Sequence, residues 1–591
     1  MSYLSKLFDA IYGRIVHMPE KRLLIIIAVL VGVATALIVS LFEAFVLGLK
    51  DFFSQFSSSE TNGNYVYLFL PLTGIIIVTL FVKYFVKDNI SHGVTRVLKA
   101  ITHNRAALKV HNMFSSVIAG AVTIGFGGSV GPEAPIIMTG SAIGSNIARV
   151  FKMGGRSTTI LLACGAAGAL AAIFKAPITG VVFVLEVLLI DLSMATIIPI
   201  LITAVTSTSL IYMIHGFEPV FAVQLEEAPL MVGHLPYYLI LGVLCGLVGC
   251  YVIFFSAKIE SLFRKMKHQY IKWIVGGTII GALVFYFPSL YGQGYESISM
   301  LLSGDSSQVL ANSIFFTFKD SQWTVLTLFA AIVVTKVIAM ASTNAAGGVG
   351  GVFAPSLFMG AFTGYFTAML LNLLFGIDLP IVPFVLVGMA GVMSGAMDAP
   401  LTAIFLLAEI TGGYKLFLPL MLASAIAYAI SYYFTPYSVY TRELVLDGDN
   451  LSLTKDRSMF FIEIDNIIEK GFVSIKEETT LGDMVKAVEQ SKRNLFPVVK
   501  NNGKLVGYVT LDDIRGDMFK RELYNYQTAK NYMTIARFVI KKSDTISAIL
   551  NKFDNSGTWN LPVVSEEGAY IGFISKSKIF SEYRNLLKEN A

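Results

Sequence analysis

The chain contains few charged residues and few cysteines. Only 14% of its 591 residues are Asp, Glu, Lys or Arg, whereas soluble domains average roughly 25%. The cysteines all lie in apolar segments, at Cys164, Cys245 and Cys250. They are therefore expected to be buried small side chains, and they predict neither a disulfide framework nor a metal site. The net charge of +5 is small for this length, and the basic residues alternate between loops instead of forming a nucleic-acid face.

Apolar residues are abundant instead: they make up 55% of the chain, and the mean hydropathy is +0.67. A helix needs about 20 apolar residues to cross a bilayer. Runs of about that length cover 23–49, 66–86, 157–173, 194–214, 236–255, 271–288, 323–341 and 416–434. They predict an integral, multi-pass membrane protein. No cleavable signal peptide is evident, and Arg14, Lys21 and Arg22 precede the first run. The N-terminus is therefore expected in the cytoplasm, with the protein in the inner or plasma membrane.

The hydrophobic part contains the same glycine-proline pattern twice. GGSVGPEAP at 127–135 and GGVGGVFAP at 347–355 share five residues at an offset of 220, and the segments 164–186 and 387–409 match at an offset of 223. Paired Gly/Pro-interrupted segments in two halves of a membrane protein predict broken helices that meet near the midplane. We therefore expect an all-α domain with an inverted-topology repeat.

The composition changes near Leu446, and the following part is charged and patterned like a soluble α/β domain. It also repeats, because Phe496-Pro-Val-Val recurs as Leu561-Pro-Val-Val at an offset of 65. Each copy is predicted to hold a helix, two strands and a second helix. The predicted segments are an N-terminal stretch 1–22, a membrane domain 23–446 with halves of about 23–215 and 235–440, and a cytoplasmic pair 447–591 with copies of about 467–525 and 529–587.

Glu133 is the acid of the first glycine-proline motif, and it lies between Pro132 and Pro135. Ionisable side chains inside membranes are costly and mark functional sites by default. The flanking prolines suit the first turn of a helix, where unpaired N–H groups attract anions. A tethered carboxylate would compete with a dissolved anion there, so Glu133 is a candidate gate. The alternative is a neutral, hydrogen-bonded structural acid. Phe353 occupies the equivalent position of the second motif.

These motifs resemble those of the CLC family of chloride channels and chloride/proton exchangers. Gly131-Pro-Glu-Ala-Pro135 resembles its gating-glutamate motif, Gly351-Val-Phe-Ala-Pro355 its GxFxP motif, and Tyr437-Ser-Val-Tyr-Thr441 the segment with its pore tyrosine. The resemblance implies that Glu133 gates the pathway, that the N–H groups of Val352 and Phe353 line an anion site together with Gly131, and that Tyr440 donates its hydroxyl there. It also implies a homodimer in the lipid bilayer and paired CBS domains in the tail.

Two positions depart from the family pattern. The first anion motif maps best onto Ser91-His-Gly-Val-Thr95, so His92 and Gly93 stand where a serine-containing turn often holds the ion. An imidazole can also donate a hydrogen bond and, when protonated, adds a positive charge; the alternative is a loop histidine away from the ion. The second departure is Val187, which stands where exchangers typically carry an internal proton-relaying glutamate. Its neighbour Glu186 and the repeat-related Glu409 are expected to be structural or interfacial.

The tail resembles CBS modules that sense adenine nucleotides. Their Gly-x-x-[Thr/Ser]-x-x-Asp ending is kept by the first copy as Gly507, Thr510 and Asp513, whereas Lys578 replaces the acid in the second. Adenine nucleotide is therefore a candidate ligand at Thr510 and Asp513. The alternative is a pair that merely braces a dimer.

We expect a transport protein and no enzyme, with chloride or another small monovalent anion as substrate and with no required cofactor or metal. Because Val187 cannot relay protons, passive anion conduction gated at Glu133 is the preferred function. Chloride/proton exchange is the first alternative, since some exchangers lack that acid. A non-conducting membrane sensor or scaffold is the second. Clustered carboxylates, which a divalent-cation pathway would need, are missing from the motifs.

Overall fold

A computed structural model describes residues 18–57, 65–103, 106–190, 192–221, 223, 232–304, 306, 308–310, 313, 315–316, 321–446 and 464–590. The chain divides into two compact units, Met1–Asp449 and Asn450–Ala591. This division matches the change of composition in the sequence, so the two parts of the chain fold as separate units.

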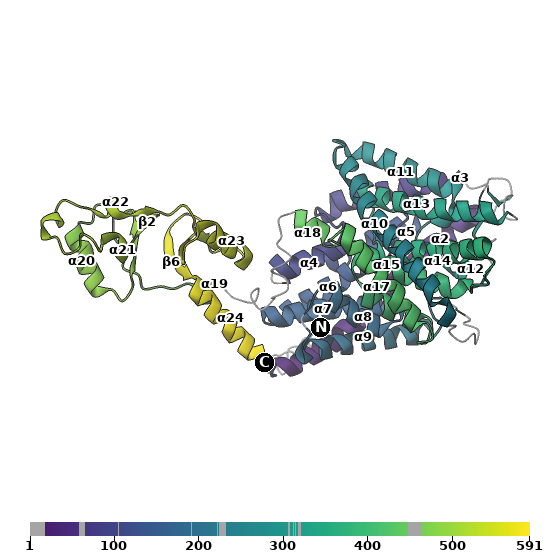
Figure 1. Cartoon of the computed structure of the whole chain (residues 1–591), viewed down its shortest axis with the longest axis horizontal. Coiled ribbons are helices and arrows are strands. Elements are labelled where there is room, and N and C mark those ends of the chain that lie inside the picture. The colour runs from purple at the N-terminus through teal and green to yellow at the C-terminus, as the bar shows by residue number, and fades with distance from the viewer. Residues whose placement is uncertain are drawn as a thin grey trace, which may run out of the picture. The chain divides into compact units, whose positions relative to one another are not determined.

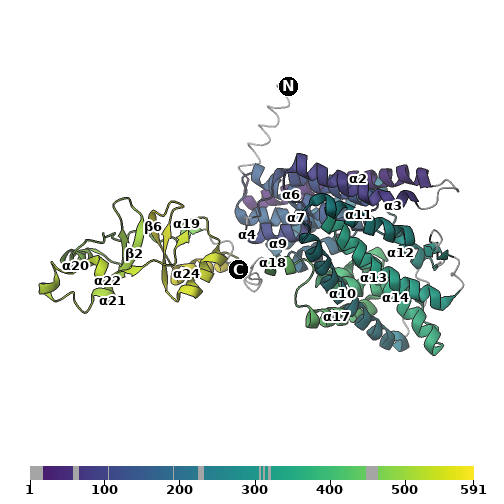
Figure 2. The same ribbon diagram turned by 90° about the horizontal axis from the view of Figure 1, so that it is seen from above.

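The described part of the first unit is helical, as expected for a membrane domain (Figures 1 and 2). In Figure 2 the long helix α2 runs along one edge of this unit. The main helices are α2 (Glu20–Ser57), α3 (Tyr65–Phe81), α4 (Gly93–His103), α5 (Ser115–Gly125), α6 (Glu133–Val150), α7 (Gly155–Phe174), α8 (Pro177–Glu186), α9 (Met194–His215), α10 (Leu235–Arg264), α11 (Gln269–Tyr286), α12 (Tyr295–Leu302), α13 (Gln322–Ala346), α14 (Phe353–Phe375), α15 (Ile381–Met397), α16 (Pro400–Ile410), α17 (Phe417–Phe434) and α18 (Arg442–Leu446).

Nine helices in the described part of the chain are long and apolar enough to cross a membrane. Eight of them overlap the runs predicted from the sequence, and the ninth is α14, which the hydropathy pattern did not single out. Helix α14 begins at the second glycine-proline motif and is largely buried inside the protein.

The two halves pack their helices in the same way. In the first half, Gly140 of α6 lies against the carbonyl group of Gly165 in α7, and in the second half Gly360 of α14 lies against that of Gly388 in α15. A side chain at any of these positions would collide with the facing backbone. The matched contacts, at the offsets of 220 and 223 seen in the sequence, confirm the predicted inverted repeat. Small residues at helix crossings are typical of membrane proteins.

The second unit consists of two similar α/β copies. Its main elements are α19 (Ile464–Ile467), α20 (Leu481–Gln490), β1 (Leu495–Val499), β2 (Leu505–Thr510), α21 (Leu511–Ile514), α22 (Ala529–Tyr532), β3 (Thr534–Ile535), β4 (Ile540–Lys541), α23 (Ile546–Ser556), β5 (Asn560–Val564), β6 (Tyr570–Ser575) and α24 (Lys576–Asn590). They form two three-stranded sheets, ordered β1-β2-β3 and β4-β5-β6. Phe496 pairs with Val509 in one sheet, and Leu561 pairs with Ile574 in the other, so the register repeats with the predicted offset of 65.

Each copy has its own apolar core, and the two copies also share backbone. Ile467 of α19 lies at the start of the first copy in the chain but packs into the core of the second. The turns after β1 and β5 are joined by hydrogen bonds, in which the Leu505 N–H donates to Gly568 O (3.2 Å) and the Tyr570 N–H to Gly503 O (3.1 Å). Strands β2 and β6 accordingly lie near each other in Figure 1. The copies therefore form a single folded pair.

Candidate functional site

The two glycine-proline loops meet in the middle of the first unit. The Gly131 N–H donates to Gly351 O (2.9 Å), and the Gly351 N–H donates to Gly131 O (2.8 Å). Each loop follows a helix that ends near a glycine with positive φ, Gly127 (87°) in the first half and Gly347 (115°) in the second. Glycine adopts this backbone conformation at little cost. The reciprocal pairing brings the first turns of α6 and α14 together, although 220 residues separate them in the chain.

Two threonines hold the loops in place, and each of them lies in the opposite half of the domain from the loop that it contacts. Thr123 of α5 accepts the N–H of Val349 on its hydroxyl oxygen (3.0 Å), and Thr343 of α13 accepts that of Ser129 (3.3 Å). These threonines are themselves related by the offset of 220. Each loop is thus positioned by a helix of the other half, which fixes the two helix N-termini relative to each other.

Glu133 reaches from the start of α6 to the N-terminus of α14. Its side chain is fully buried, and its Oε1 accepts the N–H of Phe353 at 2.6 Å. The carboxyl group lies directly over Gly131 and Gly351, where a Cβ atom would collide with it. Helix N-termini carry unpaired N–H groups and a partial positive charge, and they bind anions for that reason. The carboxyl group of Glu133 therefore occupies a position suited to a small anion.

The other carboxyl oxygen of Glu133, Oε2, is buried and has no hydrogen-bond partner among the described residues. An unpaired buried oxygen is costly, and protonation or a bound water would relieve that cost. The aromatic ring of Phe353 stacks on Phe174 with 4.9 Å between ring centroids, which closes the apolar side of the site. The carboxyl group of Glu133 is thus buried against the first turn of α14, where the N–H group of Phe353 is its donor.

Tyr440 lies within electrostatic range of Glu133, and its side chain is buried. Its hydroxyl group donates to Met397 Sδ at 3.8 Å, and its carbonyl oxygen accepts the hydroxyl group of Thr95 at 3.1 Å. A thioether is a weak acceptor. The hydroxyl group can therefore turn to an anion at little cost.

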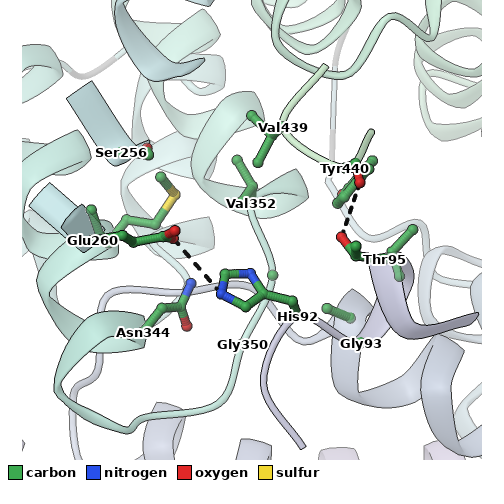
Figure 3. A pocket seen from close by; sticks show the side chains of 15 residues that line it. His92, Gly93, Thr95, Ser256, Glu260, Asn344, Gly350, Val352, Val439 and Tyr440 are labelled. Carbon is green, nitrogen blue, oxygen red and sulfur yellow. Dashed lines mark hydrogen bonds and ion pairs between the residues drawn. The ribbon is translucent and has the colours of Figure 1, made fainter. Parts of the chain in front are cut away.

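A cavity adjoins this region and contains about 440 Å³ of empty space, part of it open to solvent (Figure 3). It brings together four of the predicted anion-site residues, which are His92, Gly93, Val352 and Tyr440. The other two, Gly131 and Phe353, lie with Glu133 behind the cavity wall that Gly351 forms. Four of the predicted residues therefore line one cavity, and the other two lie next to the residues of its wall.

His92 lies in this cavity but faces an acid. Its φ is 52°, and its Nε2 is 3.9 Å from Oε1 of Glu260 in α10. In Figure 3 the imidazole ring points toward Glu260, while Tyr440 lies on the other side with Thr95. Gly93 opens α4 directly against Ala134 of α6, where a Cβ atom would collide with the carbonyl oxygen. The sequence pattern did not single out Glu260, because it is one of several charged residues near the end of an apolar run.

Lys336 is a second residue that the sequence pattern did not single out. It is fully buried in α13, where its Nζ donates to Ser129 Oγ (2.8 Å) and Gly292 O (3.2 Å) and lies 4.7 Å from the ring centre of Phe358. Ser129 belongs to the loop that precedes Glu133. A lone lysine in the apolar run 323–341 was the available signal, since intramembrane charges are rarely accidental.

The comparisons with known proteins agree with this geometry. Residues 73–432 match the family model described as voltage gated chloride channel, and residues 464–519 and 529–585 each match the CBS domain. The first match covers more than half of the chain. The chain belongs to the voltage-gated chloride channel family. Anion transport across a membrane is accordingly its function in the broad sense, and its tail holds two CBS domains.

Several members of this family are similar over most of the membrane unit. An H(+)/Cl(−) exchange transporter ClcA of Vibrio vulnificus is 29% identical over 434 residues, 70% of this chain and 88% of that protein. A ClcB-like chloride channel protein of Ralstonia nicotianae is 29% identical over 391 residues, 65% of this chain and 86% of that protein. The solved structure of a slow cyanobacterial Cl−/H+ antiporter superimposes with a TM-score of 0.63 at 22% identity, over 73% of this chain and 98% of the other.

The position that carries an internal acid in many exchangers of this family is filled by the buried, aliphatic Val187. It follows α8, whose last residue Glu186 reaches the N-terminus of α16 and accepts the N–H groups of Leu401 (3.0 Å) and Thr402 (2.7 Å). Glu409 of α16 makes the same contacts in return, with Ile178 (2.9 Å) and Thr179 (2.8 Å) at the start of α8. Both acids therefore act as helix caps exchanged between the halves.

The candidate nucleotide residues of the first CBS domain bond to each other. Asp513 Oδ2 accepts both the N–H and the hydroxyl group of Thr510 at 2.7 Å, at the exposed start of α21. In the second domain, Ser575 donates instead to Oε1 of Glu469 at 2.6 Å. The hydroxyl group and the carboxylate that a nucleotide would contact are thus adjacent in the first copy, whereas a glutamate occupies the equivalent place in the second.

Proposed function

We propose that the protein exchanges chloride for protons across the membrane, with Glu133 as the group that binds the proton and alternates with the anion. The sequence favoured passive conduction because of Val187. The names of several relatives favour the alternative, since exchangers and antiporters recur among the similar proteins and solved structures. A ClcB-like channel protein is also among them, so the proposal also depends on the chemistry of the site.

The contact between Glu133 and Phe353 is the observation that carries the proposal. A carboxylate that accepts the first N–H of α14 holds the position where an anion would gain the same hydrogen bond, so both cannot bind there at once. Hydrogen bonds to charged groups contribute about 1.5–3 kcal/mol each. Protonation removes most of that gain from the carboxyl group and lets an anion replace it. Proton binding and anion binding are thereby linked through one side chain.

Simultaneous chloride and pH measurements on vesicles that contain the full-length protein test the proposal. With the voltage clamped near zero, chloride efflux down its gradient should carry protons inward and make the vesicle interior more acidic. In Glu133→Ala, chloride should move without protons. Chloride efflux from wild-type vesicles at constant internal pH would contradict exchange and favour the channel, and an absence of flux would favour a sensor or scaffold.

We also propose that the first CBS domain binds an adenine nucleotide at Thr510 and Asp513. The observation in favour is that the hydroxyl group of Thr510 and the carboxylate of Asp513, which the family resemblance expects to contact phosphate and ribose, lie together at an exposed position. The homodimer and the cytoplasmic position of both chain ends stay predictions, and neither proposal depends on them.

A further inference from the structure

Exchange requires a proton path that connects Glu133 to the solution, and this inference depends on the proposed function. The family position for an internal proton-relaying acid is aliphatic here, at Val187. The cavity in Figure 3 offers another route, because it is partly open to solvent and reaches Gly351, the residue over which the Glu133 carboxyl group lies. A titratable group in this cavity would stand close to the gate.

Glu260 is the acid of this cavity, and its presence there needs an explanation. Its side chain is 22% exposed, and a fixed negative charge beside an anion pathway repels the ion that the pathway must admit. Its neighbours are the imidazole of His92 at 3.9 Å and the charged Arg264, one turn further along α10, also at 3.9 Å. Arg264 is more exposed and is shared with Glu443 of α18 at 4.0 Å. Arg264 therefore only partly offsets the charge of Glu260.

The cavity also contains a polar atom that lacks a partner. Ser256 lies one turn before Glu260 on α10, is 6% exposed and lines the cavity, and its hydroxyl oxygen has no hydrogen-bond partner among the described residues. Asn344 lines the same wall. A buried hydroxyl group of this kind usually binds water or a ligand. The cavity therefore offers polar groups that can bind water or an ion near the His92–Glu260 pair and Gly351.

We propose that Glu260, paired with His92, is the proton acceptor that position 187 lacks, and that it takes up a proton from the solution and returns it toward Glu133 through this cavity. One O–H bond forms on the Glu260 carboxylate and breaks when the proton leaves for the Glu133 carboxylate. When His92 is neutral and Glu260 is ionised, the two side chains together carry a net charge of −1. One added proton brings this net charge to 0, and a second brings it to +1. Protonation therefore also removes the charge that repels an incoming anion, so the proton and the anion favour each other's binding.

Asp398 is the competing candidate. It follows α15 with a φ of 55°, its Oδ1 is buried without a partner among the described residues, and it lies within electrostatic range of Glu186. It does not line the cavity, however. The carboxyl oxygens of Glu186 accept hydrogen bonds from N–H groups at the start of α16. The cavity pair has the more direct access to the gate, and substitutions at the two acids distinguish them.

The test compares Glu260→Gln, Asp398→Asn and the matched control Glu443→Gln in vesicles with chloride and pH followed together. Glu443 is the other acid beside Arg264 and does not line the cavity. In Glu260→Gln we expect proton movement per chloride to fall at least about tenfold while chloride flux persists, because a positioned proton-transfer group typically contributes about 100-fold or more to its step. Glu443→Gln and Asp398→Asn should couple like the wild type, and Glu260→Asp should restore coupling.

Coupling that survives in Glu260→Gln would overturn the inference, and so would a loss confined to Asp398→Asn. Wild-type protein that moves chloride without protons would instead refute the proposed function, and the inference with it. Retained chloride flux in Glu260→Gln shows that the variant is folded. If Glu260→Gln loses chloride flux, Glu260→Asp is the deciding variant. Chloride flux and proton coupling that both return in Glu260→Asp support a carboxyl group at position 260 as the proton acceptor. Chloride flux that returns without proton coupling contradicts the inference.

Discussion

The two glycine-proline loops have nearly the same backbone but different chemistry. Both loops receive a threonine bond from the other half, both end in a helix N-terminus, and they pair with each other through Gly131 and Gly351. Only the first carries an acid, Glu133, whereas the second carries Phe353 at the same position. A symmetric backbone thus builds two facing helix starts, and only one of them carries a carboxyl group, which we propose as the gate.

Other pairs of repeat-related residues also either keep the same contacts in both halves or differ between the halves. Glu186 and Glu409 keep identical capping contacts, so their role requires the same chemistry in both halves. Lys175 and Asp398 stand at equivalent positions with opposite charge: Lys175 donates to Glu218 O at 2.7 Å, while Asp398 Oδ1 has no partner among the described residues. The acids with a shared capping contact thus preserve the symmetry of the repeat, whereas Lys175 and Asp398 share no contact and differ in charge.

Removing the asymmetry at the gate should have the largest effect. In Glu133→Ala we expect coupled proton movement to disappear, and the remaining chloride flux to be insensitive to pH on either side. The reason is that no carboxyl group is left to compete with the anion at Phe353. Chloride and pH electrodes on vesicles measure both. A variant that keeps the wild-type pH dependence would contradict the gating role.

Filling the space beneath the gate should have the next largest effect. A Cβ atom in Gly351→Ala collides with the Glu133 carboxyl group and with Ala134. Overpacking typically costs about 1–3 kcal/mol, so we expect a lower thermal unfolding midpoint and a displaced gate with altered coupling. Gly413→Ala is the control, because nothing lies within 4 Å of a Cβ atom there. Equal midpoints for the two variants would show that the carboxyl group does not pack tightly against Gly351.

The exchanged caps offer a direct test of symmetry. Glu186→Gln and Glu409→Gln each remove one charged acceptor from a helix N-terminus, which should cost about 1–2 kcal/mol in either case. We expect similar falls in the thermal unfolding midpoint, with chloride flux retained. A large effect at only one of the two positions would mean that the acids do not share a purely structural role.

The two CBS copies allow a smaller-scale comparison. Thr510→Ala removes the hydroxyl group that caps α21, at a typical cost of about 1 kcal/mol, and should weaken binding of adenine nucleotide. Ser575→Ala should leave nucleotide binding unchanged, because the second copy has Lys578 in place of the acid that the first copy offers. Calorimetric titration of the full-length protein with ATP or AMP measures both. Nucleotide binding that is equal in wild type and Thr510→Ala would contradict the site.

Much of the fold follows from pattern in the chain itself. Apolar runs predict most of the long helices, and the repeats at 220, 223 and 65 predict the inverted halves and the CBS pair. The pattern missed α14, whose first residues belong to the second glycine-proline motif. It also gave no indication that α19 packs in the core of the second CBS domain, because a segment's partner in space depends on the whole pair.

The sequence by itself determined the membrane location, the repeated halves and the presence of one acid in the glycine-proline motifs, because hydropathy, glycine-proline breaks and a lone carboxyl group are local properties. Only the tertiary structure decided that Glu133 reaches the N–H of Phe353, that Glu186 and Glu409 cap each other's helices, and that His92 faces Glu260 across a cavity. Each of these contacts joins residues more than a hundred positions apart. Their distances depend on how helices pack, which no local pattern encodes.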